Sequence, residues 1–133
     1  DRRHFALNID VAPTLLDGVT REMRLWREES FGPVKAIIRV QSEEEALAVA
    51  NDSEYGLSAA VYSRDSARAW NVAQRLHTGI CHINGPTVHD EAQMPFGGCK
   101  ASGYGRFGGR AGIAEFTELR WITIQTQPRE LPF

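Results

Sequence analysis

The alternation of apolar and polar residues predicts short β-strands in the first third of the chain. Residues 4–11 carry an apolar side chain at almost every second position, which is the pattern of a half-buried strand. A second apolar run covers residues 14–19 and is broken at Asp17. Residues 34–40 give the clearest strand of this region, again apolar at every second position. We therefore expect a strand-rich beginning.

Helical patterns follow. Ser42 and Glu45 match a capping box, in which hydroxyl and carboxylate each accept a hydrogen bond from a backbone N–H group. A helix should run from there to about Asn51. Asp65 can cap a second helix, and Gly79 is placed to end it in a left-handed conformation. The apolar residues of this second helix recur at helical spacing: Ala69, Val72, Ala73 and Leu76.

The two helices separate further apolar runs. Residues 58–63 and 80–84 are typical of short buried strands, and residues 55–57 of a turn. The resulting order of strand, helix, strand, helix and strand predicts right-handed crossovers and a parallel sheet covered on both faces. The expected fold class is α/β.

The last third is less regular. Residues 85–109 are rich in glycine, proline and polar residues, and a loop of this length in a compact domain is usually functional or disordered. A helix is expected at about residues 110–119 and a strand at residues 121–125. No later segment offers that strand a partner. The chain therefore divides into residues 1–119 and a strand with its tail, residues 120–133.

Composition narrows the class of protein. A chain of 133 residues that is 42% hydrophobic and 24% charged suits one soluble globular domain. A net charge of −2 gives no reason to expect nucleic acid or a membrane surface as partner, and no apolar run is long enough to cross a membrane. Two cysteines make no disulfide framework, so we expect a reducing, cytoplasmic compartment. The chain opens on Asp1 without a methionine, which suggests that its true start lies upstream or was removed.

The turn at residues 28–34 holds the first candidate chemistry. Gly32 allows an unusual backbone path and Pro33 fixes its own φ, so Glu29 and Phe31 should leave the turn at defined angles. A fixed carboxylate beside an aromatic ring suits a sugar diol next to a flat heterocycle. The alternative is a solvated acidic turn with Phe31 in the core.

Residues 103–108 fit the dinucleotide-binding pattern G-x-G-x-x-G and precede a helix. That motif binds a pyrophosphate only when a strand leads directly into the glycines. Residues 99–102 are not expected to form a strand, and no later strand carries an acid for the ribose. We therefore reject this segment as a phosphate site.

Several residues that can bind metals are close in the sequence: Cys81, His82, His89, Asp90 and Glu91. Neighbours on a strand point to opposite faces, so Cys81 and His82 cannot share one ion, and we expect no metal site. Cys99 has only Lys100 as a cationic neighbour in the sequence, which is too little to activate a thiol. We expect Cys99 to fill a loop and Cys81 to be a buried strand thiol.

Taken together, four segments resemble the NAD(P)-dependent aldehyde dehydrogenase family. Residues 28–34 resemble its E-E-x-F-G-P-V segment, and residues 51–61 its N-x-x-x-Y-G-L-x-A-x-V turn and strand. Residues 79–84 are similar to G-x-x-x-x-N, and residues 95–106 to P-F-G-G-x-K-x-S-G-x-G-R. The resemblance covers nearly the whole chain, in order and at matching spacing.

The resemblance implies roles for several residues. Glu29 would bind the ribose hydroxyls beside the nicotinamide, and Phe31 would pack near the nicotinamide ring. Asn84, Met94 and Phe96 would border the aldehyde pocket. The cofactor would be NAD or NADP, with NAD favoured. The residues that face the ribose 2′ position, which distinguish the two cofactors, would lie upstream.

The resemblance also defines what this chain lacks. The family's nucleophilic cysteine, general-base glutamate, oxyanion-hole asparagine and phosphate loop all precede the matched segment, so no catalytic residue is assigned and the isolated chain should be inactive. Residues 1–119 would be the C-terminal part of the catalytic domain. The strand at residues 121–125 would join a neighbouring subunit in a homo-oligomer. Phe107 stands where many members carry glutamate.

The loop at residues 84–94 most resembles members that act on aromatic aldehydes of the salicylaldehyde, vanillin and benzaldehyde type. The resemblance therefore implies oxidation of an aromatic aldehyde to its acid. The alternative is a non-catalytic interaction module that keeps this fold for assembly alone.

Overall fold

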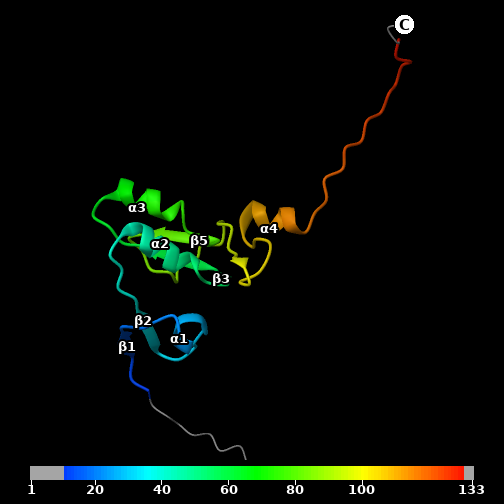
Figure 1. Ribbon diagram of the computed structural model, residues 1–133. Helices are drawn as coiled ribbons and strands as arrows, with labels where there is room; N and C mark the ends of the chain where they lie inside the picture. Colours follow the sequence, from blue (N-terminus) through cyan, green and yellow to red (C-terminus); the bar gives the residue numbers. More distant parts are fainter. Residues whose placement is uncertain (1–10, 131–133) are drawn as a thin grey trace, which may run out of the picture. The chain divides into compact units, whose positions relative to one another are not determined.

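A computed structural model describes residues 11–130 (Figure 1). These residues fall into two compact units. The first contains the chain up to Ser53 together with Gln74–Leu76, and the second contains Glu54–Ala73 and the chain from His77 onward. The strand expected at residues 4–11 lies outside the described residues, except for its last position.

The first unit contains a parallel pair of strands. β1 (Thr14–Asp17) pairs with β2 (Val34–Ile37), and the pairing ends where Asp17 faces Ile37. Gly18 follows with a φ of 71°, which turns the chain away from the pair. The strand expected at residues 34–40 is therefore shorter than predicted, because its partner ends first. A four-residue helix that the pattern did not predict, α1 (Arg24–Arg27), lies between the two strands in sequence.

The helix expected after Ser42 is confirmed as α2 (Glu43–Asn51). The Oγ of Ser42 accepts a hydrogen bond from the Glu45 N–H at 3.1 Å. The Glu45 carboxylate returns to the N–H of Gln41, at 2.7 Å, and not to that of Ser42 as the capping box predicted. The helix buries Leu47, which is only 4% exposed.

The second unit is built on another parallel pair. β4 (Ser58–Val61) pairs with β5 (Ile80–Ile83), and α3 (Ser66–Ala73) connects them and packs against both. The predicted cap is confirmed, since Asp65 Oδ1 accepts a hydrogen bond from the Arg68 N–H at 3.0 Å. Ala69 is fully buried, at 0% exposure. This unit confirms the expected strand–helix–strand arrangement with parallel strands.

Two expectations about this region are wrong. Gly79 was expected to end the second helix in a left-handed conformation, but α3 already ends at Ala73 and Gly79 does not adopt a positive φ. A Cβ on Gly79 would instead overlap the carbonyl oxygen of Gly97, so glycine is required for close backbone packing. The single parallel sheet is not formed either: the described strands make three separate two-stranded sheets. The mixed α/β content of the prediction is confirmed.

The expected turn at residues 55–57 is in fact a strand. β3 (Tyr55–Gly56) pairs antiparallel with β6 (Cys99–Lys100). The backbones of Phe96 and Phe107 also bond to each other in both directions, at 2.9 and 2.7 Å. The long loop is therefore held by backbone pairing with partners distant in sequence.

The C-terminal part is less regular than predicted. α4 (Gly109–Glu115) is four residues shorter at its C-terminus than the expected helix. Residues 121–125 form no strand, and Trp121 is 90% exposed. A strand needs a partner for its backbone groups, and residues 11–130 offer this segment none. No helix in the described part of the chain is long and apolar enough to cross a membrane.

Candidate functional site

In the turn at residues 28–34, in the first unit, the two neighbouring carboxylates of Glu28 and Glu29 have different hydrogen-bonding environments. Glu28 is the C-cap of α1, and its carboxylate accepts two hydrogen bonds from Arg24, both at 2.7 Å. The Arg24 guanidinium holds the pKa of Glu28 below its ordinary value. Glu29 has no hydrogen bond or ion pair within residues 11–130. Phe31 is 97% exposed, so the alternative that placed its ring in the core is wrong.

The backbone of this turn is fixed around Pro33. The Val34 N–H donates to the Gly32 carbonyl at 2.8 Å, across Pro33, whose fixed φ suits this tight γ-turn. The Thr14 N–H donates to the Pro33 carbonyl, also at 2.8 Å, which ties the turn to β1. Glu29 and Phe31 are therefore presented to solvent close to an anchored turn.

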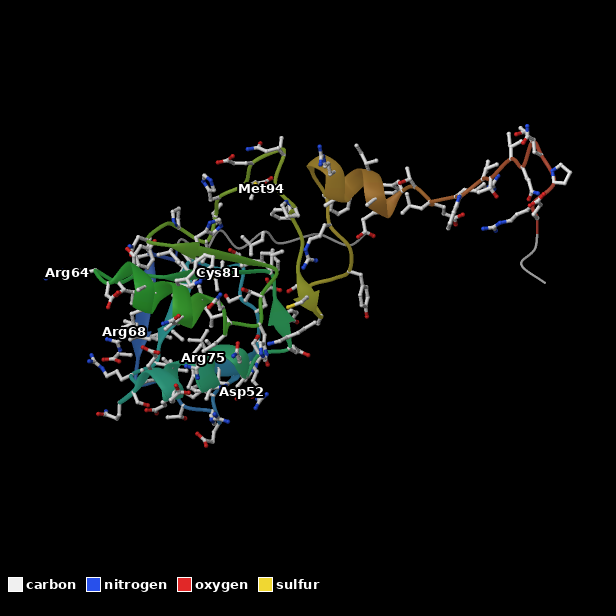
Figure 2. All side chains as sticks on the ribbon, turned by 90° about the horizontal axis from the view of Figure 1, so that it is seen from above. Asp52, Arg64, Arg68, Arg75, Cys81 and Met94 are labelled. Carbon is white, nitrogen blue, oxygen red and sulfur yellow. The ribbon has the colours of Figure 1, made fainter. Side chains whose placement is uncertain are left out.

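The second unit contains a cavity of about 410 Å³. It lies between β5 and the loop that follows that strand, and Figure 2 shows Cys81 on β5 and Met94 on the loop. Its lining residues are Gly79, Ile80, Cys81, His82, His89, Asp90, Glu91, Met94, Pro95 and Phe96. Two residues predicted for the aldehyde pocket, Met94 and Phe96, thus line one cavity.

Asn84 takes a different position. It follows β5 with a φ of 56°, and its side chain bonds to the backbone of Ser63. The Ser63 N–H donates to Asn84 Oδ1 at 2.9 Å, and Asn84 Nδ2 donates to the Ser63 carbonyl at 3.0 Å. Its amide is therefore engaged in holding the ends of β4 and β5 together, and Asn84 does not line the cavity.

The cavity wall also carries two histidines that sequence reasoning considered only as metal ligands. The rings of His82 and His89 meet edge to face, with their centroids 5.5 Å apart. His89 Nε2 lies 3.4 Å from a carboxylate oxygen of Glu91. Among the residues that the structure describes, no group of three potential ligands is arranged to hold a metal ion.

The sequence is similar to those of known proteins. Residues 3–122 match the aldehyde dehydrogenase family. The chain belongs to the aldehyde dehydrogenase family.

Two curated relatives show how much of an aldehyde dehydrogenase is present. A vanillin dehydrogenase from Pseudomonas fluorescens is 67% identical over 120 residues, which are 90% of this chain and 25% of that protein. A benzaldehyde dehydrogenase [NAD(+)] from Pseudomonas putida is 46% identical over 121 residues, again 90% of this chain and 25% of that protein. The chain thus spans about a quarter of the length of these relatives.

Solved structures agree with this assignment. The salicylaldehyde dehydrogenase from Pseudomonas putida G7, complexed with salicylaldehyde, matches with a TM-score of 0.83 at 52% identity, over 90% of this chain and 25% of that one. A succinic semialdehyde dehydrogenase from Streptococcus pyogenes, in complex with NADP+, matches with a TM-score of 0.81 at 41% identity, over 86% of this chain and 25% of that one.

Neither thiol of this aldehyde dehydrogenase chain is set up as a nucleophile. Cys99 lies in β6 and not in a loop as predicted, and its Sγ donates to the carbonyls of His77, at 3.2 Å, and Gly56, at 3.5 Å. The Cys99 thiol is thus engaged with backbone carbonyls. Burial raises the pKa of Cys81, which favours its protonated form.

Among the glycines at residues 103–109, Gly108 and Gly109 serve close backbone packing. The prediction that no strand precedes them is wrong, since β6 forms at Cys99–Lys100, but two residues still separate it from Gly103. A Cβ on Gly108 would overlap the carbonyl oxygen of Met94, and the Gly109 N–H donates to the Ala92 carbonyl at 3.1 Å. These glycines support the loop that lines the cavity, a role that sequence reasoning missed because it depends on a contact between distant residues.

Phe107, where many family members carry glutamate, contributes mainly through its backbone. Its N–H and carbonyl both pair with Phe96, while its ring is largely exposed. A glutamate could make the same backbone bonds, so this pairing does not depend on the departure.

Proposed function

We propose that this chain is the C-terminal part of an enzyme that oxidises an aromatic aldehyde to its carboxylic acid with NAD or NADP. The observation that carries the proposal is that one anchored turn presents both a carboxylate without a hydrogen-bond partner among the described residues, Glu29, and an exposed aromatic ring, Phe31. Support for the aromatic substrate comes from the 67% identity to a protein named vanillin dehydrogenase.

The residues of the turn fit the cofactor. A carboxylate offers two acceptor oxygens to the two hydroxyls of a ribose, and an exposed phenylalanine ring offers an apolar face to a nicotinamide. When bound, the cofactor supplies the acceptor for the hydride that leaves the aldehyde. We favour NAD because a relative that is 46% identical carries NAD(+) in its name. A similar structure nevertheless contains NADP+.

The second unit would provide part of the aldehyde pocket. Met94 and Phe96 line the cavity and offer apolar contact to an aromatic ring. Asn84 would border the pocket indirectly, since its amide holds the end of β5 from which the lining loop departs.

The nucleophile would come from outside this chain. Family resemblance implies a cysteine thiolate that attacks the carbonyl carbon, and a water molecule that later releases the acid from the thioester. Burial raises the pKa of Cys81, and the Cys99 thiol donates to the backbone carbonyls of His77 and Gly56. The isolated chain should therefore show no aldehyde-oxidising activity.

Exchanging Glu29 for Gln tests the cofactor role. In the complete enzyme, Glu29→Gln should slow hydride transfer about tenfold or more while changing the cofactor Kd less, because the charge-assisted contact to the ribose is lost and the distant phosphate contacts remain. Single-turnover formation of NAD(P)H and a fluorescence titration of cofactor binding measure the two quantities.

The neighbouring carboxylate gives the matched control. Glu28 is already bonded to Arg24, so Glu28→Gln should leave hydride transfer unchanged. Hydride transfer at the parent rate in Glu29→Gln would show that Glu29 is only a solvated turn residue.

The assembly and location of the enzyme are part of the same proposal. We place it in the cytoplasm, where cysteines stay reduced, and both cysteines of this chain are free. We also propose that residues 121–125 pair with a neighbouring subunit, because Trp121 is exposed and the segment has no strand partner in the described structure.

The intact mass of the natural protein separates this proposal from a non-catalytic interaction module. The enzyme requires a chain several times longer than the present one, since 120 residues are 25% of the relative. A natural protein of only 133 residues would favour the module.

A further inference from the structure

The loop that follows β5 turns back along the strand pair. β4 and β5 run parallel, and Ser58 at the start of β4 pairs with Ile80 at the start of β5. The chain leaves β5 at its other end, where Asn84 begins the loop. The Ser58 hydroxyl nevertheless donates to the carbonyl of Thr87 at 2.8 Å. Between Asn84 and Thr87 the backbone therefore returns toward the end at which both strands begin.

This reversal brings the loop back to the start of β5. The cavity of about 410 Å³ is lined by residues 79–82, at the start of β5, and by residues 89–91 and 94–96 of the loop. The loop residues follow Thr87 closely in the sequence, so the position of Thr87 limits where they can lie. Ser58 does not line the cavity itself. Its hydroxyl holds the point from which the loop reaches the cavity.

Few hydrogen bonds hold this part of the loop in place. The loop is anchored at its start by the amide of Asn84 and near its end by the carbonyl of Ala92, which accepts a backbone hydrogen bond. Between these anchors, among the described residues, the Ser58–Thr87 bond is the one hydrogen bond that joins residues 85–91 to another element. The bond is exposed, so water can take its place at the carbonyl. Its contribution is therefore to fix the position of the loop, and not to satisfy a buried acceptor.

We propose that Ser58 is a positioning residue for aldehyde binding, because its hydroxyl holds the loop in the position that forms the cavity wall. This inference rests on the proposed function, in which the cavity is part of the aldehyde pocket. Without the bond, the loop occupies the binding-competent position for only a fraction of the time, and the apparent affinity for the aldehyde falls by that fraction. A bound aldehyde selects the same loop position, so the rate at saturation is retained.

Steady-state kinetics of the complete enzyme with benzaldehyde test the inference. Ser58→Ala should raise the KM for the aldehyde about three- to tenfold, which corresponds to the loss of one hydrogen bond, and should leave kcat and the cofactor Kd within about twofold of the parent. Ser58→Thr keeps the hydroxyl on a residue that suits a strand, so it should retain the parent KM. Ser58→Val has the shape of threonine without the hydroxyl, and it should raise the KM as alanine does. The comparison of Thr with Val also decides the question if Ser58→Ala does not fold.

Ser42→Ala provides the matched control. It also removes a serine hydroxyl that bonds to the backbone, but Ser42 caps α2 in the first unit and does not line the cavity. This variant should lose stability and keep the parent KM.

The outcomes separate the inference from the proposed function. A parent KM in Ser58→Ala, or the same KM in Ser58→Thr and Ser58→Val, would overturn the inference while the proposed function stands. A lower kcat at an unchanged KM would show a structural role alone and would overturn the inference as well. A parent enzyme that oxidises no aromatic aldehyde would overturn the proposed function, and the inference with it.

Discussion

At the scale of single residues, Asn84 combines an unusual backbone conformation with a side-chain anchor. Its φ of 56° lies in the left-handed region, which asparagine tolerates better than most residues. Its amide also bonds to both backbone groups of Ser63. Family resemblance marked this asparagine as a pocket residue, and the structure adds the reason why an asparagine suits the position.

Substitution of Asn84 separates these two contributions. Asn84→Ala should lower the free energy of unfolding of the complete enzyme by about 1–2 kcal/mol, since it loses the hydrogen bonds and strains the backbone. Asn84→Gly loses the same bonds but accepts the positive φ, so it should be less destabilised than Asn84→Ala. Denaturant unfolding measures both variants. Equal stability of the two would show that the backbone conformation contributes nothing.

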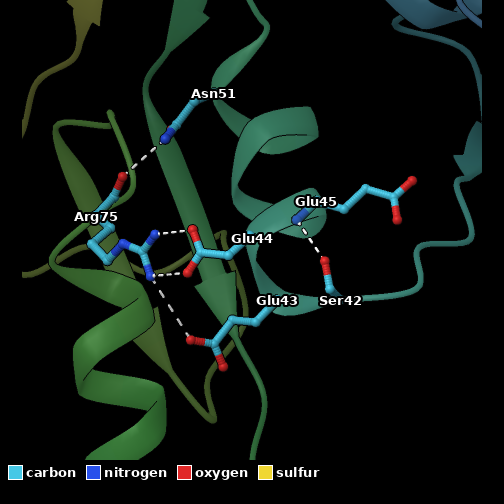
Figure 3. Close-up of polar contacts among 6 residues, drawn as sticks. All are labelled: Ser42, Glu43, Glu44, Glu45, Asn51 and Arg75. Atoms are coloured by element: carbon cyan, nitrogen blue, oxygen red, sulfur yellow. Dashed lines mark hydrogen bonds and ion pairs between the residues drawn. The ribbon is translucent and has the colours of Figure 1, made fainter.

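At the scale of elements, α2 is held by a local cap and by contacts with a residue distant in sequence, Arg75, all visible in Figure 3. Ser42 caps its first turn. Arg75, which is 31 residues away from Glu44, donates to both oxygens of that carboxylate, and Asn51 Nδ2 donates to the Arg75 carbonyl at 2.9 Å. The local contact is readable from the sequence as a motif, whereas the distant contacts are not.

The Arg75–Glu44 ion pair should make stability depend on pH. Hydrogen bonds from Arg75 lower the pKa of Glu44 in the folded protein. The stabilisation is therefore present above the ordinary glutamate pKa, about 4.3, and is lost as the pH falls through the lowered value. Arg75→Gln should lower the unfolding midpoint slightly at pH 7 and low salt, and the difference from the parent should shrink below about pH 4.

Exposure limits the size of this effect. The Arg75 and Glu44 side chains are 47% and 72% exposed, so the difference should be small and should weaken in high salt. Glu44→Gln provides the control, because adding Arg75→Gln to it should have little further effect. A difference that persists undiminished in acid would rule out the ion pair as its source.

At the scale of the whole molecule, residues 119–124 expose several large apolar side chains to solvent, which is unfavourable for a chain without a partner. Leu119, Trp121, Ile122 and Ile124 are all largely exposed. Backbone groups in this segment also lack strand partners among the described residues. Both features would be relieved by addition of the segment to a sheet of another subunit, as we propose.

Removal of residues 121–133 from the complete enzyme tests this assembly. The truncated enzyme should form smaller particles in light scattering, because the segment proposed to join the neighbouring subunit is gone while the proposed site residues remain. Deletion of residues 127–133 alone provides the control, since it leaves the apolar segment in place. An undiminished oligomeric mass after the longer truncation would show that residues 121–125 do not join subunits.

Elements whose signals are local could be predicted from the sequence alone. The caps at Ser42 and Asp65 identified α2 and α3, because a cap and its helix lie within one turn of each other. The apolar runs that became β4 and β5 were equally clear. Membership of the aldehyde dehydrogenase family was also readable, since several spaced motifs occurred in order.

Features that depend on which distant segments meet could be read only from the folded chain. β3 looked like a turn because its partner, β6, lies more than 40 residues away. Residues 121–125 have the pattern of a strand but form none, because a strand exists only with a partner for its backbone groups.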